Sequence, residues 1–122
     1  MILVDTSVWV DHLRAKDKAL ASLLHAGQAL AHPFVVGELA LGTLRQRAPI
    51  LAALQGLPQA TVATDWETLQ FIERNYLLGA GIGYVDAHLL AAVRLTPGAI
   101  LWTRDKRMRA AGRLGLAADP PT

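Results

Sequence analysis

Four acidic residues in this chain could together carry out metal-dependent chemistry: Asp5, Glu38, Asp86 and Asp105. Asp5 directly follows the apolar run 2–4, and Asp105 lies three residues beyond Trp102, at the end of another apolar run. No Lys or Arg lies within one helical turn of Glu38 or Asp86. Because burying an unpaired charge is costly, a metal ion is a candidate partner for these carboxylates.

The ligand types indicate which ion to expect. The chain has no Cys, and a set of carboxylates favours a hard divalent ion, Mg²⁺ or Mn²⁺, over Zn²⁺. Mg²⁺ keeps several of its waters, so a few protein ligands are sufficient. Such a site can activate water for in-line attack on a phosphodiester. We therefore predict divalent-metal-dependent hydrolysis of a phosphodiester bond.

Each acid also has a purely structural interpretation. Asp5 could be a turn or N-cap residue, Asp86 a helix N-cap, and Asp105 a solvated turn residue. Glu38 is the hardest to interpret in this way, because its neighbours in the sequence are apolar. His88 could be a ligand or a base, but we predict a partly buried histidine whose hydrogen bonds are satisfied.

Basic residues gather around Asp105, although the net charge of the whole chain is only +2. The segment contains Arg104, Lys106, Arg107, Arg109 and Arg113. It could be a solvated helix face or a phosphate-binding surface. Beside a metal-dependent site, such a segment would hold a nucleic-acid backbone.

The elements that must position these residues alternate between short apolar strands and amphipathic helices. Strands are predicted at 2–4, 28–31, 60–63, 99–102 and 116–118. Helices are predicted to begin near Thr6, after Asp17, at Pro33, at Ile50, after Thr64, at Tyr84 and after Asp105. This alternation implies right-handed crossovers and a mainly parallel sheet covered on both sides. If the first and fourth strands are central, Asp5 and Asp105 emerge at the same edge of that sheet.

Composition limits the remaining possibilities. With 122 residues, of which 52% are hydrophobic, the chain is expected to form a single domain over 1–122. Its apolar runs are too short to span a bilayer, and its N-terminus lacks the pattern of a signal peptide. The absence of Cys excludes a disulfide framework and thiolate metal sites. We expect a cytoplasmic protein with no membrane partner.

Two other chemistries that use carboxylates at strand ends do not fit the spacing. A receiver-like phosphotransfer domain needs an acidic pair after its first strand, whereas Asp5 stands alone before Thr6 and Ser7. An Asp-x-Asp phosphatase fails because position 7 is Ser. The remaining alternative is a non-catalytic module that binds RNA or protein.

Four motifs in order resemble those of PIN-domain ribonucleases, specifically the VapC-type toxins of toxin–antitoxin pairs. They are Asp-Thr-Ser-Val-Trp at 5–9, Val-Gly-Glu-Leu at 36–39, Tyr-Val-Asp-Ala-His-Leu-Leu-Ala at 84–91 and Thr-Arg-Asp-Lys at 103–106. Each motif is weak by itself, but the four in this order are specific and cover nearly the whole chain. The resemblance implies a PIN-like three-layer α/β/α sandwich around a central, mainly parallel sheet of four to five strands.

The resemblance also implies an activity. It suggests a Mg²⁺- or Mn²⁺-dependent endoribonuclease whose catalytic and metal-binding residues are Asp5, Glu38, Asp86 and Asp105. Asp5, Glu38 and Asp86 would bind the main ion, and Asp105 would bind it through water or hold a second ion. Supporting hydroxyls are expected at Thr6 or Ser7 and at Thr103. Arg104, Lys106, Arg107 and Arg109 would neutralise RNA phosphates.

The resemblance also implies two protein partners, a second copy of the chain and an antitoxin. They usually form homodimers, and a cognate antitoxin silences them by inserting into the active-site groove. Their substrates are RNAs, often structured ones.

The chain departs from the family pattern at Met108, because many relatives carry an aromatic residue near this position after the fourth acid. This difference affects packing more than chemistry. Of the four acids, Asp105 varies most in the family.

Overall fold

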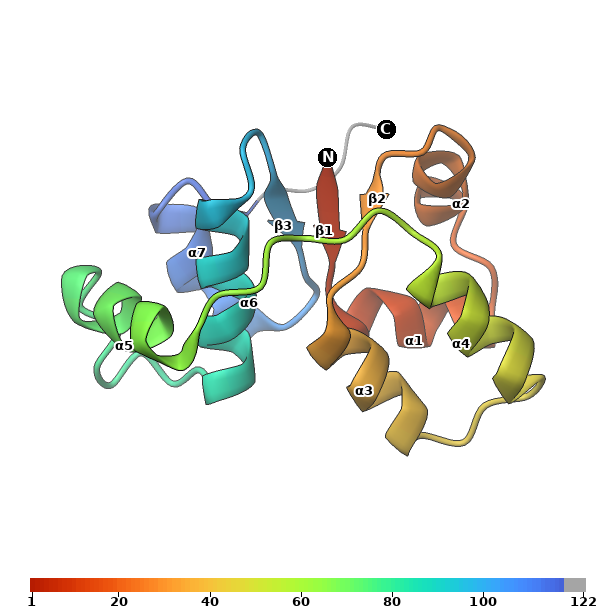
Figure 1. Ribbon diagram of the computed structural model, residues 1–122, viewed down its shortest axis with the longest axis horizontal. Coiled ribbons are helices and arrows are strands. Elements are labelled where there is room, and N and C mark those ends of the chain that lie inside the picture. The colour runs from red at the N-terminus through yellow and green to blue at the C-terminus, as the bar shows by residue number, and fades with distance from the viewer. Residues whose placement is uncertain (118–122) are drawn as a thin grey trace.

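A short parallel sheet lies at the centre of the computed structural model, which describes residues 1–117 without the side chains of residues 109 and 110. Strands β1 (Ile2–Val4), β2 (Ala29–Leu30) and β3 (Ile100–Trp102) are arranged in the order β2-β1-β3 (Figure 1). In the register, Leu3 pairs with Leu30 on one side and with Leu101 on the other. The first strand is therefore central, as its run of buried apolar residues predicts.

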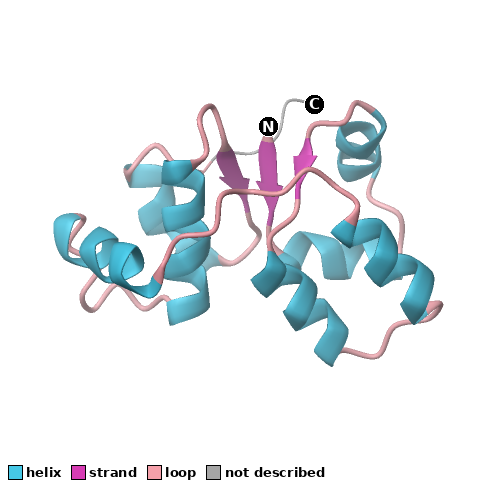
Figure 2. Ribbon diagram, viewed as in Figure 1, coloured by secondary structure: helices cyan, strands magenta, loops and turns pink. Residues whose placement is uncertain are grey.

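Helices lie to both sides of these strands (Figures 1 and 2). On the β2 side are α1 (Thr6–Arg14), α2 (Lys18–His25), α3 (Pro33–Leu41) and α4 (Arg47–Gln55). On the β3 side are α5 (Asp65–Arg74), α6 (Tyr84–Leu95), the short 3₁₀ helix η1 (Lys106–Met108) and α7 (Arg109–Arg113). None of the helices in residues 1–117 combines the length and apolar character needed to cross a membrane.

The sheet is smaller than the four to five strands expected from the sequence. Among the described residues it has three strands, and each edge gains only one isolated parallel bridge, Ala31 to Gln59 and Leu101 to Ala117. The segment predicted as a strand at 60–63 is rich in small residues of weak β-propensity and meets an edge strand only two residues long. Residue 118, the end of the predicted last strand, lies outside the described residues.

Local sequence signals place several helix starts. Thr64 and Glu67 form the reciprocal pair of hydrogen bonds of a capping box at the start of α5. Pro33 occupies the first turn of α3, and Asp17 accepts a hydrogen bond from the N–H of Leu20 at the start of α2. The helix expected from Ile50 begins three residues earlier, at Arg47.

The most deeply buried elements are those that carry site residues. Leu3 and Val4 of β1, Leu89 and Leu90 of α6, and Leu101 of β3 are each 0% exposed. Burying each such leucine is worth roughly 1.5–3 kcal/mol relative to leaving it exposed. The ends of β1 and β3 and the start of α6 therefore rest on a rigid core, and the chemistry-bearing residues follow at those ends.

Candidate active site

Asp5 lies at the carboxyl end of β1, 6% exposed, where the chain turns into α1. It holds the N-cap position of that helix, but its side chain makes no capping hydrogen bond. Instead, Oδ2 accepts hydrogen bonds from Ser7 Oγ and from Thr103 Oγ1, both at 2.7 Å. Among the side chains and backbone groups that the structure describes, no hydrogen-bond donor reaches its Oδ1. The Asp5 carboxylate is therefore oriented by Ser7 and Thr103 and does not cap α1.

The two hydroxyls that hold Asp5 are themselves fixed by the backbone after β3. Ser7 Oγ accepts a hydrogen bond from the N–H of Arg104 at 3.0 Å, and Thr103 Oγ1 accepts one from the N–H of Asp105 at 3.1 Å. Each hydroxyl has one proton, which it donates to Asp5, so both act as polarised relays between an amide and a carboxylate. Ser7 and Thr103, two of the residues expected to supply supporting hydroxyls, thus contact Asp5 directly.

Glu38 approaches from α3 and is more exposed than its apolar neighbours in the sequence suggested. Val35 and Leu39 are buried on the packed side of the helix, whereas Gly37 and Glu38 are exposed. Thr6 Oγ1 donates a hydrogen bond to Glu38 Oε1 at 2.7 Å and so ties the start of α1 to α3. Glu38 is therefore a solvent-facing carboxylate held by a hydroxyl.

Asp86 is half-buried in the first turn of α6, where its Oδ2 accepts a hydrogen bond from the N–H of Gly83 at 3.3 Å. Its pKa is raised, first by burial and then by the negative charges of Asp5, Asp105 and Glu38, while the Gly83 N–H opposes this shift. Asp86 thus makes a helix-start hydrogen bond and also lies within electrostatic range of the other three acids.

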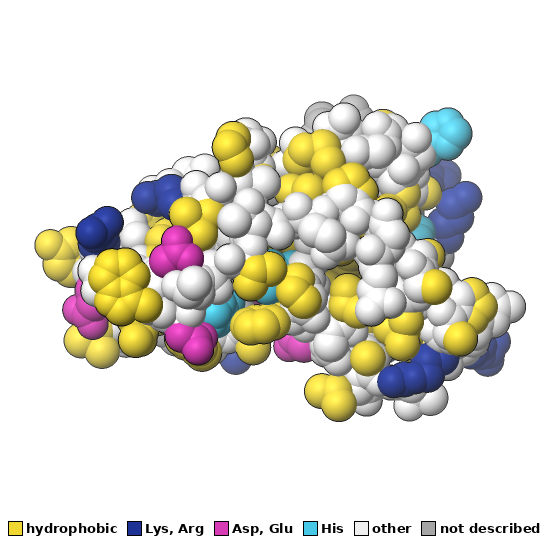
Figure 3. All heavy atoms as spheres, in the orientation of Figure 1, with side chains coloured by type: hydrophobic (Ala, Val, Ile, Leu, Met, Phe, Trp, Pro, Cys, Tyr) yellow, Lys and Arg dark blue, Asp and Glu magenta, His cyan; other side chains and the backbone are white. Residues whose placement is uncertain are grey.

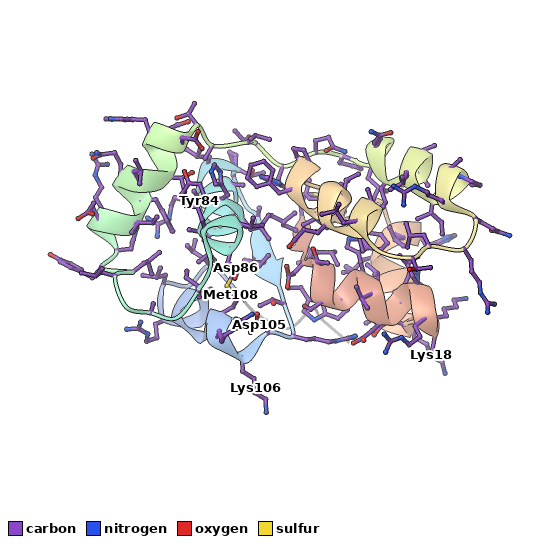
Figure 4. All side chains as sticks on the ribbon, turned by 90° about the horizontal axis from the view of Figure 1, so that it is seen from below. Lys18, Tyr84, Asp86, Asp105, Lys106 and Met108 are labelled. Carbon is purple, nitrogen blue, oxygen red and sulfur yellow. The ribbon has the colours of Figure 1, made fainter. Side chains whose placement is uncertain are left out.

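Asp105 lies in the turn after β3, with its side chain 24% exposed. It accepts hydrogen bonds from the backbone N–H of Arg107 at 2.9 Å and from the Arg107 guanidinium, whose Nη2 lies 2.8 Å from Oδ2. The guanidinium bond, reinforced by the backbone one, lowers the pKa of Asp105. Figure 4 looks at the carboxyl ends of the strands and shows Asp86 and Asp105 close together there. Asp105 therefore bonds the backbone of its own turn, as a turn residue does, and still lies close enough to Asp86 for their charges to interact.

The four carboxylates form a loose set of possible ligands for a divalent ion. The structure brings four carboxylates to one edge of the sheet, and their mutual repulsion contributes to the raised pKa of Asp86. Within residues 1–117, no three acidic or histidine side chains are grouped tightly enough to hold an ion among them. A hydrated ion that keeps several waters fits this loose set of oxygen donors.

The predicted phosphate-binding residues differ in their surroundings. Lys106 is exposed and projects away from the molecule (Figure 4). Arg107 is exposed and paired with Asp105. Arg104 forms ion pairs with Asp11 and Asp17. The side chain of Arg109 lies outside the described part of the structure.

The hydrogen bonds of His88 are satisfied, as predicted, but the residue is fully buried, at 2% exposed, where a partly buried side chain was expected. Its Nδ1 lies 3.1 Å from Thr68 Oγ1, and its Nε2 lies 3.1 Å from Asp65 Oδ1. The Tyr84 hydroxyl also donates to Asp65 Oδ1, at 3.1 Å. Sequence reasoning missed this network between α5 and α6. The only signal available was the presence of Asp65 beside the capping box.

Comparisons with known proteins agree with this geometry. Residues 2–114 match the family model described as PIN domain. The chain is 53% identical over 111 residues to Ribonuclease VapC32 of Mycobacterium tuberculosis, with the same figures for strains CDC 1551 and H37Rv. That alignment covers 91% of this chain and 90% of the relative.

The fold also has a counterpart among solved structures. The crystal structure of FitAcB from Neisseria gonorrhoeae superposes with a TM-score of 0.66, covering 99% of this chain and 98% of the other at 18% identity. This likeness concerns the fold alone. The family match extends over most of the sequence, so the chain belongs to the PIN-domain family. Within that family, its resemblance to the VapC-type ribonucleases is confirmed.

Proposed function

We propose that this chain is a divalent-metal-dependent endoribonuclease that acts as the toxin of a toxin–antitoxin pair. The observation that carries the proposal is the buried Asp5, oriented by Ser7 and Thr103 within electrostatic range of Asp86. The similarity to Ribonuclease VapC32 supports RNA as the substrate class.

Asp5, Glu38 and Asp86 are proposed to hold the ion, Mg²⁺ or Mn²⁺, and Asp105 to bind it through water or to hold a second ion. When bound, the ion supplies a Lewis acid that lowers the pKa of the attacking water and offsets charge on the phosphodiester. The chain's own hydroxyls orient the ligands: Ser7 and Thr103 fix Asp5, and Thr6 fixes Glu38. One of the carboxylates accepts the proton of the attacking water.

Phosphates of the RNA are proposed to contact the basic residues that follow Asp105. Lys106 is exposed beside the site, and Arg107 and Arg109 follow it in η1 and α7. Neutralising each phosphate releases counterions, so RNA affinity should fall as salt rises. Arg104 was predicted to belong to this group, but its guanidinium is engaged by Asp11 and Asp17.

The antitoxin is proposed to occupy a groove between α1, α3 and the segment that joins α3 to α4. The groove has a volume of about 920 Å³, reaches Glu38, and has apolar walls that include Val10, Leu13 and Ile50. Arg14 also lines it, so a partner with apolar and acidic side chains fits. Leu13→Glu should weaken inhibition by the antitoxin and leave RNA cleavage unchanged. Equal inhibition of this variant and the wild type would place the antitoxin elsewhere.

A homodimer is proposed as well, and we place the protein in the cytoplasm with its RNA substrates. Large apolar side chains stand exposed in and after α5, with Trp66 67%, Leu69 54%, Tyr76 88% and Leu78 95% exposed. Figure 3 shows large apolar side chains exposed at this end of the molecule, interspersed with charged ones. Patches of this kind are typical of protein interfaces. A monomer mass by light scattering at micromolar concentration would contradict the dimer.

The decisive experiment incubates the purified, antitoxin-free protein with cellular RNA in Mg²⁺, in Mn²⁺ and in EDTA. Asp5→Asn is expected to abolish cleavage and leave the fold intact, whereas Glu73→Gln, which removes an exposed carboxylate of α5, should cleave like the wild type. Metal-dependent cleavage that needs Asp5 supports the nuclease, and the fragment ends then identify the bond cut. Full activity of Asp5→Asn would refute the metal-site assignment. No cleavage in either metal would favour a non-catalytic binding module.

A further inference from the structure

Arg104 belongs to the loop after β3, but its guanidinium reaches across to the α1–α2 corner. Nη1 lies 2.5 Å from Asp11 Oδ2 in α1, and Nη2 bonds Oδ2 of Asp17, the N-cap residue of α2. The guanidinium also lies 5.4 Å from the ring centroid of Trp102. A planar, forked cation is suited to bridging two carboxylates in this way.

Asp17, one of the two carboxylates that bind Arg104, is itself fixed by hydrogen bonds. Asp17 uses Oδ1 to cap α2, accepting from the Leu20 N–H at 3.0 Å, and its own N–H donates to His12 Nδ1 at 3.0 Å. Its remaining oxygen, Oδ2, holds Arg104. The bonds from Leu20 and Arg104 both lower the pKa of Asp17. Asp17 therefore presents a stable negative charge from a rigid corner.

The backbone of Arg104 is part of the active site. Its N–H donates to Ser7 Oγ, and its neighbours are Thr103, which bonds Asp5, and Asp105, which faces Asp86. Two contacts therefore hold residues 103–105: the backbone N–H of Arg104 bonds the Ser7 hydroxyl, and the Arg104 guanidinium pairs with Asp11 and Asp17.

We propose that Arg104 is a positioning residue which, clamped by Asp11 and Asp17, holds residues 103–105 so that Thr103 and Asp105 meet Asp5 and Asp86. This inference rests on the proposed nuclease function. In the clamp, Asp11 and Asp17 engage different nitrogens of the one guanidinium, so its forked donors are already used within the protein. Arg104 is therefore assigned to positioning and not to phosphate binding.

The test separates positioning from phosphate binding by adding positive charge. The double variant Asp11→Asn, Asp17→Asn raises the net charge by two, and Asn retains the cap at position 17. If the clamp positions the site, kcat falls about 10–100-fold, the range for lost supporting contacts, while KM for RNA does not rise. The matched control is the double variant Gln28→Lys, Gln55→Lys, which also adds two positive charges at exposed positions and keeps the wild-type kcat.

Phosphate binding by Arg104 predicts the opposite pattern. The Asp11→Asn, Asp17→Asn variant would free the guanidinium, keep kcat and lower KM, whereas Arg104→Gln would raise KM and reduce the salt dependence of binding. That result would overturn the proposal. Arg104→Lys gives a second probe, because it keeps the charge and loses the fork, and the clamp predicts that kcat still falls.

A readout without metal or RNA distinguishes failure of the clamp from failure of the nuclease. Hydrogen exchange at the amides of Arg104 and Asp105 should accelerate about 10-fold or more in the Asp11→Asn, Asp17→Asn variant and in Arg104→Gln, and not in the Gln28→Lys, Gln55→Lys control. Unchanged exchange would refute the clamp even if the wild type cleaves RNA. Accelerated exchange in a protein that cleaves no RNA would retain the clamp and reject the nuclease.

Discussion

Replacing Thr103 with Val should destabilise this protein through the charge of Asp5. Thr103 Oγ1 donates to Asp5 Oδ2 at 2.7 Å, a length typical of a hydroxyl bonded to an ionised carboxylate. Such a bond is worth about 1.5–3 kcal/mol. Val has nearly the same shape, and it also removes the acceptor of the Asp105 N–H, a loss that does not depend on the charge of Asp5. For a domain of this size, we expect the melting temperature to fall by about 6–12 °C.

The double-mutant cycle isolates the contribution of charge. In the Asp5→Asn background the same hydrogen bond becomes neutral, and Thr103→Val should then cost only about 0.5–1.5 kcal/mol. Urea denaturation in EDTA measures the free energy of unfolding of all four proteins. Thr61→Val is the control, because Thr61 is exposed, and should change stability by less than about 0.5 kcal/mol. Equal losses from Thr103→Val in both backgrounds would refute the charge-assisted role of this hydroxyl.

Three further outcomes follow from the titrating and buried groups. Because burial and the neighbouring carboxylates raise the pKa of Asp86, the metal-free protein loses stability as pH rises above the ordinary carboxyl value of 3.8. Asp86→Asn should remove this loss and stabilise the metal-free protein at neutral pH in urea denaturation, and an unchanged or lower stability would contradict this prediction. Burial, with the charge of His88, lowers the pKa of His32 to about 4. The free energy of unfolding should therefore fall by about 3 kcal/mol as pH drops from 6.5 to 4, because the unfolded chain binds a proton that the buried histidine does not. His32→Asn, which can still cap α3, should show a flatter profile of stability against pH. Thr68→Val leaves the buried His88 Nδ1 without its partner and should cost about 1–3 kcal/mol in thermal or urea unfolding, a prediction that a loss below about 0.5 kcal/mol would contradict.

The sequence by itself determined the features that neighbouring residues specify. Three apolar residues before Asp5 specified a buried strand that ends in a carboxylate, and Thr64 with Glu67 specified the start of α5. Pro33 specified the first turn of α3. These signals were sufficient because a cap, a turn or a buried strand depends on residues within about one helical turn.

Other features were decided only by tertiary packing. Whether 60–63 becomes a strand depends on the length of the neighbouring edge, which the segment itself does not encode. The exposure of Glu38 depends on which side of α3 meets the core, and that helix is apolar almost throughout, so periodicity could not choose a face.

The partners of the site residues show the same limit most clearly. Thr103 reaches Asp5 across 98 positions in the sequence, and Arg104 reaches Asp11 across 93. From sequence alone, Arg104 was one basic residue among several. Parallel pairing of β1 with β3 brings the loop that contains Arg104 against α1. Its guanidinium there forms ion pairs with Asp11 and Asp17. The sequence supplied the chemical groups, whereas the packing of distant segments decided which of them meet.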